Sequence, residues 1–296
     1  GDVWTQRSPG GDLPKGRLYH SMAYDAERRQ VVMFGGVPHS APTPSVTYTY
    51  DGTSWVRAST TGPTYIRGSA LAYDSVRKVV VLFGGHLDGR ESDETWEWNG
   101  NWTQLSPRGL MPAARSSHAM VYDAARRETV LFGNHSADWA GGDTWVWDGA
   151  EWQRKASGKR PAARFGHTMV YDPARRRTVL FGGSDEHTYN HEPWEWDGKE
   201  WQHITDAGPG ERAWHAMTYD SAANRVLIFG GETLGIDVPQ TWSWNGTQWT
   251  LLTTTGPNLI RGSSIIFGSL RERTLLFGGV DANIVLYNEI WELKGN

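Results

Sequence analysis

Short apolar runs recur along the chain and end in the same three residues. Runs of this length with turn residues at their ends predict β-strands, and a fixed period predicts a repeat architecture. The phenylalanines that begin these three-residue segments are separated by 49, 49, 49, 48 and 48 residues. Phe-Gly-Gly begins at Phe34, Phe83, Phe181, Phe229 and Phe277, and a Phe-Gly-Asn variant begins at Phe132.

Each repeat has the same order of polar and apolar segments. It reads R-x-x-H-x-M-x-Y-D, a charged turn, the apolar run into Phe-Gly-Gly, a variable loop, T-W-x-W-[DN]-G and a final tryptophan. This order predicts four strands per repeat. The Tyr-Asp-x-x-Arg segments, such as Tyr122 to Arg126, predict the turn between the first two strands. The Asp-Gly and Asn-Gly pairs predict two-residue type I′ turns between the third and fourth strands. These pairs begin at Asp51, Asn99, Asp148, Asp197 and Asn245.

Six such repeats predict an all-β fold, a six-bladed β-propeller with four antiparallel strands per blade. The last repeat stops at "IWELKGN", after its third strand, whereas the chain begins with "WTQRSP" at Trp4. That opening segment matches "WTQLSP" at Trp102, which belongs to a fourth strand. We therefore expect the N-terminal strand to complete the last blade, and residues 1–296 to form a single domain.

These repeats resemble the kelch propellers, whose marks are the double glycine after the second strand and the tryptophan spaced behind it. The likeness covers essentially the whole chain and is strongest to bacterial six-bladed kelch proteins, with a propeller like the central domain of galactose oxidase. It implies the fold and says little about activity, because one fold hosts many functions. Galactose oxidase relies on a cysteine–tyrosine crosslink at copper, which a chain with 0 cysteines does not form. Sialate mutarotase, a kelch propeller with no required metal, leaves proton transfer on a bound small molecule open.

The charge, the apolar runs and the motifs of the chain exclude several kinds of partner and cofactor. The net charge of -4 provides no basic field for a nucleic-acid backbone, so we expect no nucleic-acid partner. No apolar run approaches the roughly 18 residues of a membrane span, so we expect a soluble protein without a membrane partner. P-loop and dinucleotide motifs are absent from the sequence, which predicts no nucleotide or flavin cofactor. The compartment is not indicated.

One arginine and one small or imidazole side chain recur before each predicted first strand. We expect the arginines to form a ring at the channel mouth, either paired with Glu94, Asp143, Glu192 and Glu289 or free to clamp a carboxylate or phosphate. Arginines at this place contact ligand in kelch domains that read acidic peptides. The histidines are interpreted as scaffold between blades, and Ala70 and Ser264 as their small replacements, which widen the mouth. The arginines are Arg17, Arg67, Arg115, Arg164, Arg212 and Arg261, and the histidines are His20, His118, His167 and His215.

Most of the 17 tryptophans recur in register and are interpreted as packing between blades. Trp139 and Trp214 break that register and remain ligand-binding candidates. The loops after each double glycine are where the repeats differ, and in kelch folds these loops lie on the same face as the arginines. The most polar of them is "SDEHTYNHEPW", which begins at Ser184.

A site could form where these loops converge. Histidine and carboxylate side chains there suit either acid–base chemistry or a divalent metal such as zinc, iron or manganese. The catalytic candidates are Asp185, His187, His191 and His135, of which the three histidines are also the metal candidates. The ligand-binding candidates are Arg17, Arg67, His86, Trp139, Tyr189, Trp214, Glu232, Arg261 and Tyr287.

Two functions follow from this placement. The first is a small-molecule enzyme, of isomerase, cyclase or lyase type, that binds a polar or anionic substrate at the mouth and uses acid–base chemistry with or without a metal. The second is a binding module in which the same loops only grip a peptide or glycan. Solvated loop polarity is the simplest interpretation of any one of these residues taken alone.

Overall fold

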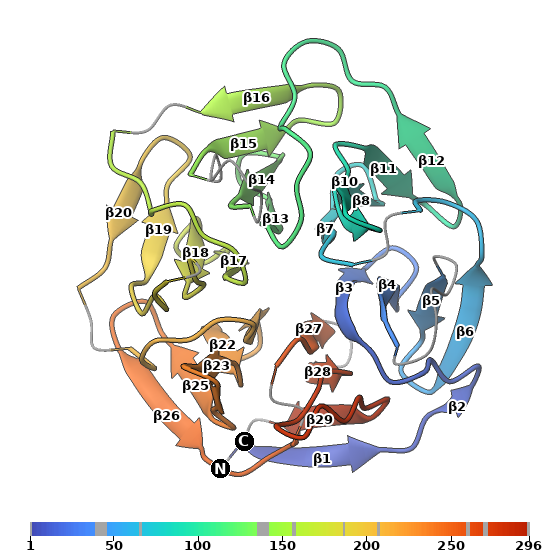
Figure 1. Cartoon of the computed structure of the whole chain (residues 1–296), viewed down its shortest axis with the longest axis vertical. Coiled ribbons are helices and arrows are strands. Elements are labelled where there is room, and N and C mark those ends of the chain that lie inside the picture. The colour runs from blue at the N-terminus through green and yellow to red at the C-terminus, as the bar shows by residue number, and fades with distance from the viewer. Residues whose placement is uncertain are drawn as a thin grey trace.

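Six β-sheets surround a central axis in the computed structural model (Figure 1). The structure describes residues 2–38, 46–64, 67–134, 142–155, 158–185, 187–205, 208–258, 261–268 and 272–294. All regular structure in these ranges is β-strand. The six-bladed propeller predicted from the repeats is therefore confirmed.

The first three blades follow the repeats in chain order. Blade 1 holds β3 (Leu18–Asp25), β4 (Gln30–Val37), β5 (Thr47–Tyr50) and β6 (Ser54–Ser59), with β2 (Gly10–Gly11) added at its edge. Blade 2 holds β7 (Ala70–Asp74), β8 (Val79–Phe83), β11 (Thr95–Trp98) and β12 (Trp102–Leu105), and its loop carries the hairpin β9 (His86–Leu87) with β10 (Arg90–Glu91). Blade 3 holds β13 (Ala119–Asp123), β14 (Glu128–Phe132), β15 (Thr144–Trp147) and β16 (Trp152–Lys155).

The last three blades repeat this order. Blade 4 holds β17 (Thr168–Asp172), β18 (Arg177–Phe181), β19 (Trp194–Trp196) and β20 (Trp201–His203). Blade 5 holds β21 (Ala216–Asp220), β22 (Arg225–Phe229), β25 (Thr241–Trp244) and β26 (Trp249–Thr253), with the loop hairpin β23 (Glu232–Thr233) and β24 (Ile236–Asp237). Blade 6 holds β27 (Ser264–Gly268), β28 (Arg273–Phe277), β29 (Ile290–Lys294) and β1 (Val3–Arg7).

The N-terminal strand closes the ring, as predicted. β1 pairs antiparallel with β29, from Val3 opposite Lys294 to Arg7 opposite Ile290 (Figure 1). The Trp4 side chain is buried against Phe229 of blade 5, with ring centroids 5.2 Å apart. Closure thus pairs the edge of blade 6 and also joins it to its neighbour.

The phenylalanine of each Phe-Gly-Gly is the centre of a blade-to-blade contact. Its ring meets the fourth-strand tryptophan of the next blade in all six interfaces, with centroids 5.0–5.4 Å apart. Such tilted and edge-to-face pairs each contribute about 0.5–1.5 kcal/mol beyond the area they bury. The pairs are Phe34–Trp102, Phe83–Trp152, Phe132–Trp201, Phe181–Trp249, Phe229–Trp4 and Phe277–Trp55.

The two glycines are required by close approach of the chain, as blade 4 shows. A Cβ on Gly182 would lie 2.4 Å from the carbonyl oxygen of Arg212 in blade 5. A Cβ on Gly183 would lie 2.8 Å from the Cβ of His167 in its own blade. The Gly183 N–H donates to that same Arg212 carbonyl at 2.9 Å, so the missing side chains permit a backbone link between blades.

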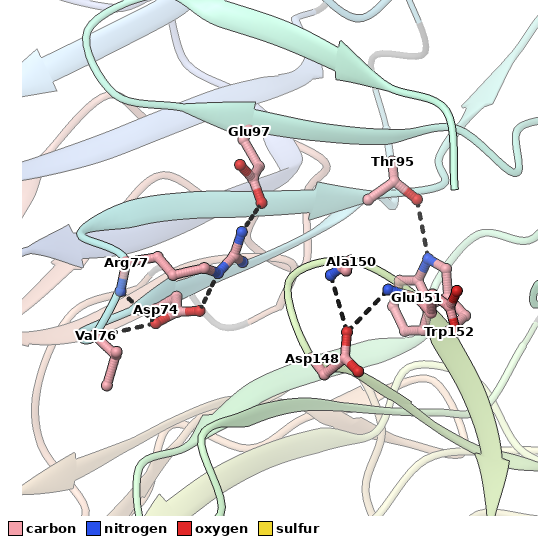
Figure 2. A network of polar contacts seen from close by, with 9 residues as sticks. All are labelled: Asp74, Val76, Arg77, Thr95, Glu97, Asp148, Ala150, Glu151 and Trp152. Carbon is pink, nitrogen blue, oxygen red and sulfur yellow. Dashed lines mark hydrogen bonds and ion pairs between the residues drawn. The ribbon is translucent and has the colours of Figure 1, made fainter. Parts of the chain in front are cut away.

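The turns between third and fourth strands differ from the predicted type I′ form. In blade 3, Trp147 pairs with Trp152, which leaves four residues in the loop rather than two. Only Gly149 has a positive φ there (102°), whereas a type I′ turn needs two such residues. The Asp148 carboxylate instead accepts the backbone N–H groups of Ala150 and Glu151, each at 2.9 Å (Figure 2). The aspartate therefore acts through its side chain.

Candidate functional site

Six backbone hydrogen bonds form a closed ring around the channel at the end where the first strands begin. We call this end the mouth. Each N–H donates to the carbonyl of the neighbouring blade's equivalent residue, over 2.8–3.3 Å. All six residues have a positive φ, between 57° and 65°. The ring residues are Tyr19, Gly68, Ser117, Gly166, Trp214 and Gly262.

Relative to this ring, Arg67 of blade 2 and Arg261 of blade 6 are one residue out of register with the arginines of the other four blades. Arg17 lies two residues before its ring residue, whereas Arg67 and Arg261 each lie one residue before theirs. The expected ring of six equivalent arginines is therefore wrong. Residues 66 and 260 occupy the arginine positions of blades 2 and 6 and lie outside the described residues.

The histidine position shifts by the same step. Ala70 pairs with Phe83 and Ser264 pairs with Phe277, as Ala119 pairs with Phe132 in blade 3. Neither Ala70 nor Ser264 therefore replaces a histidine, and the predicted widening at those residues is wrong. The residues in the histidine position are Ser69 and Ser263, both buried.

The four arginines that are in register are buried and donate hydrogen bonds to backbone carbonyls, as expected of scaffold residues. Arg17, a ligand-binding candidate, is buried, donates from Nη1 to the Gly35 carbonyl at 2.7 Å and lies over the Tyr48 ring. The expected acid pairing holds for Arg115, whose Nη1 is 3.1 Å from Asp143. Burial lowers the pKa of Arg164 and of Arg212 to about 10. The equivalent carbonyl acceptors of Arg115, Arg164 and Arg212 are Gly133, Gly182 and Gly230.

The four histidines are buried between blades, as interpreted from the sequence. Each imidazole packs edge-on against the phenylalanine of the preceding blade, with centroids 5.5–5.7 Å apart. Burial, followed by the nearby Arg17, lowers the pKa of His20 to about 3. Burial and then Arg164 lower the pKa of His167 to about 3. These imidazoles are neutral at pH 7.

Two aromatic side chains of the backbone ring lie against each other at the mouth. The rings of Tyr19 (blade 1) and Trp214 (blade 5) are 4.9 Å apart at 62°. Trp214 also contacts Phe165 of blade 4, at 5.7 Å, and covers Gly166, whose added Cβ would lie 3.0 Å from the indole. Both residues line the central channel cavity of about 210 Å³. Tyr19, Trp214 and Phe165 together form an aromatic surface at the mouth.

Charged groups from three other blades act on Tyr19. Burial and then the charge of Glu232 raise the pKa of the Tyr19 phenol, while the charges of Arg261 and Arg67 lower it. One phenol thus experiences two cations and one carboxylate. Arg261 of blade 6 forms an ion pair with Glu232 of blade 5, whose side chain is 13% exposed. The Tyr189 hydroxyl of blade 4 donates to the other Glu232 oxygen at 3.1 Å.

The backbone explains this convergence. In the loops of blades 1, 2, 4, 5 and 6 at the mouth, the residue after Phe-Gly-Gly pairs with the residue before the backbone ring. These bridges include Arg67 with His86 and Ala213 with Glu232. The one-residue shift of Arg67 and Arg261 therefore moves them from the buried arginine position to this bridge position. Arg67 donates from Nε to Nδ1 of His86 at 3.0 Å. His86 is thereby the neutral tautomer with its proton on Nε2.

Within the described residues, none of the other predicted side chains contacts this cluster. Asp185 accepts the N–H groups of His187 and Thr188, at 3.0 and 2.7 Å, and so shapes its own turn. His187 is exposed, and His191 is 58% exposed with Nδ1 3.9 Å from Glu211. The Tyr287 hydroxyl donates to Asp281 at 3.0 Å.

The metal hypothesis has no support within the described ranges, where no group of three or more histidine, aspartate or glutamate side chains is placed to hold a metal ion. His135 and Trp139 lie outside those ranges, so their predicted roles stay predictions. Sequence reasoning missed Tyr19 and Phe165. The signal for Tyr19 was present, because a large aromatic residue occupies a position that is otherwise glycine or serine in every blade except blade 5.

Comparisons with known proteins add no family. No protein-family model matches the chain, and no curated protein matches it significantly in sequence. In the parts of the chain that the structure describes, there is also no helix of the length and apolarity needed to cross a membrane.

Proposed function

We propose that this chain is a kelch-type propeller that binds a small anionic molecule at its mouth and acts on it by proton transfer. The observation that carries the proposal is the phenol of Tyr19, which is close enough to Arg67, Arg261 and Glu232 for all three charges to act on it. Convergent polar groups beside an apolar surface are typical of small-molecule sites.

The two arginines are the proposed anion-binding groups. Arg67 is exposed, and the Arg261 side chain is 29% exposed, so both can meet a ligand from solvent. Guanidinium groups bind carboxylates in a two-point geometry that a single ammonium does not match. The pKa of Tyr19 is raised by burial, so its phenol stays protonated at pH 7 and can donate to the same ligand.

Glu232 is the proposed base for proton transfer, and His86 is the proposed hydrogen-bond donor that assists it. A ligand carboxylate at Arg261 would compete with Glu232 for the guanidinium, and a Glu232 carboxylate released from that ion pair is a stronger base. His86 keeps its proton on Nε2, from which a neutral imidazole can donate a hydrogen bond to a ligand oxygen that gains negative charge when Glu232 removes a proton. Asp185, His187, His191 and His135 form a second proposed set, which requires the Ser184 loop to contact ligand from the rim.

One observation favours the non-catalytic alternative. Both oxygens of Glu232 are occupied in the structure, one by Arg261 and one by Tyr189. A carboxylate held in this way orients Arg261 without accepting a proton. On this second proposal the mouth is a binding module for a peptide or glycan that carries an acidic group.

A ligand-binding screen with two readouts separates these functions. Saturation-transfer NMR with a panel of small carboxylates, acidic sugars and acidic peptides in D₂O reports binding, and loss of a ligand C–H signal reports proton transfer. We expect Arg67→Ala and Arg261→Ala each to weaken binding by about tenfold or more, the loss of one charge-assisted contact. Arg127→Ala, an exposed arginine in a first hairpin away from the mouth, is the matched control.

The catalytic residues are tested by the same exchange signal. Glu232→Gln and His86→Gln should stop exchange while binding persists, and His187→Ala with His191→Ala tests the second set. Binding without exchange for any ligand would support the binding module instead. Equal binding by the parent protein, Arg67→Ala and Arg261→Ala would refute the mouth as the site.

A further inference from the structure

A second cavity lies between blades 6 and 1 on the face opposite the mouth. Its volume is about 470 Å³, within the size range of small-molecule sites. It is lined by residues at the ends of strands in both blades, among them Gly268 of β27, Arg273 of β28 and Arg28 and Arg29 of the first hairpin of blade 1. None of these residues belongs to the mouth.

Blade 6 lacks a carboxylate that the other five blades share. The first strand of blades 1–5 ends in a buried aspartate, whereas β27 ends in Gly268. The shared aspartate organises its hairpin: Asp74, for example, accepts the N–H groups of Val76 and Arg77 and pairs with the Arg77 side chain (Figure 2). The five aspartates are Asp25, Asp74, Asp123, Asp172 and Asp220.

Blade 5 shows what the missing carboxylate would contact. There Asp220 pairs across the hairpin with Arg225, and Nε of that arginine lies 3.1 Å from Oδ2 of the aspartate. In blade 6 the register is the same, and Gly268 pairs across the hairpin with Arg273. Arg273 therefore stands where an arginine binds a carboxylate in the neighbouring blade, with no side chain opposite it.

The remaining charges around the cavity have other partners. Asp51 accepts the N–H groups of Thr53 and Ser54 within its own turn. Glu292 pairs with Arg7 at 2.5 Å, and Arg28 pairs with Asp25 at 3.0 Å. Within the described residues, neither Arg29 nor Arg273 forms an ion pair, so two cations of the cavity wall have no carboxylate partner among those residues.

We propose that this cavity binds a small carboxylate, which takes the place of the aspartate that blade 6 lacks. The carboxylate would lie beside Gly268 and accept hydrogen bonds from the Arg273 guanidinium, as Asp220 does from Arg225. Arg29 supplies the second positive charge at the rim. The proposal is independent of any ligand at the mouth.

The position of Gly268 allows a direct test. A Cβ built there meets only the Arg273 carbonyl oxygen and a Tyr24 ring carbon, both at 3.8 Å, which is ordinary contact. Gly268→Asp can therefore restore the aspartate of the other blades, and Gly268→Ala adds the Cβ without the carboxylate. The first variant supplies an internal ligand, and the second is its steric control.

The measurement is saturation-transfer NMR titration with succinate, and with inorganic phosphate as the competing anion class. We expect succinate to bind the parent protein and Gly268→Ala with similar dissociation constants. Gly268→Asp and Arg273→Gln should each weaken succinate binding by about tenfold or more, since each removes or occupies the charge-assisted contact. Gly268→Asp should also unfold at a higher temperature than Gly268→Ala, which shows that the new carboxylate is seated and not merely disruptive.

Four outcomes would overturn the proposal. They are equal succinate affinity in Gly268→Asp and Gly268→Ala, no succinate binding to the parent protein, binding of phosphate but not of succinate, and loss of the succinate signal in an Arg67→Ala/Arg261→Ala double variant. The last result would move the bound carboxylate to the mouth. Retention of the signal in that double variant, together with its loss in Gly268→Asp, assigns it to the cavity between blades 6 and 1.

Discussion

The hydrogen bond between Trp152 and Thr95 tests how one blade is joined to the next (Figure 2). The indole Nε1 of Trp152 in blade 3 donates to the hydroxyl of Thr95 in blade 2 at 3.0 Å, and both side chains are buried. Thr95→Val replaces that hydroxyl by a methyl group of similar size. The indole N–H then remains buried with no acceptor.

The expected cost follows from that unpaired donor. A buried donor that loses its partner costs about 1–3 kcal/mol, and the added methyl recovers little because the site is already packed. The chain contains its own comparison. Ile290 occupies the threonine position in blade 6, and the Nε1 of Trp55 in blade 1 is buried without a partner. At position 290 threonine should therefore be more stable than valine by about 1 kcal/mol, the net value of one hydrogen bond.

The assay is equilibrium urea unfolding followed by tryptophan fluorescence, on the parent protein and three variants: Thr95→Val, Ile290→Thr and Ile290→Val. Comparing threonine with valine at both positions cancels most of the difference in apolar volume. We expect threonine to be favoured at both. A Thr95→Val variant within about 0.3 kcal/mol of the parent would show that the Trp–Thr bond does not contribute to blade cohesion.

Two further predictions use the same unfolding assay. Deleting residues 1–7 removes β1 and leaves β29 as an open edge. The deletion should therefore remove much of the total free energy of unfolding, which is about 5–15 kcal/mol for a typical domain. A truncated chain that unfolds at the same urea concentration as the parent protein would contradict this. Acid should also destabilise the protein. The folded pKa of His167 is about 3, below the ordinary 6.5, so its contribution to stability is complete above pH 6.5 and falls as the pH drops toward 3, by about 1.4 kcal/mol per pH unit. In His167→Ser, which introduces the serine found at Ser69 and Ser263, the free energy of unfolding should fall by about 2 kcal/mol less between pH 6.5 and 5 than in the parent protein. An equal loss of stability in both proteins would show that the buried imidazole is not its source.

The sequence determined the architecture because the information for it is local and repeated six times. The period of Phe-Gly-Gly, the alternation of strands and turns and the match between Trp4 and Trp102 were sufficient to predict six blades and the closing strand. Each of these features depends on residues within one repeat. Consistent signals in every repeat leave few other folds open.

The register of two repeats could also have been found in the sequence. A step of 49 from Arg17 reaches residue 66, not Arg67, as the spacing of Phe34 and Phe83 indicates. The sequence similarity around Arg67 and Arg261 favours an alignment in which both residues take the position of Arg17, one residue away from the alignment that the phenylalanine spacing gives. A register shift of one residue in a strand places a side chain on the opposite side. An alignment shifted in this way therefore assigns Arg67 and Arg261 to the buried arginine position, although they lie at the mouth.

Only the tertiary structure brought the site residues together. Tyr19 and Trp214 are 195 residues apart in the chain, yet their rings meet because blades 1 and 5 both border blade 6. The ion pair of Arg261 with Glu232 likewise joins two blades. Which side chains meet around an axis depends on how six blades pack and close, and no single repeat contains that geometry.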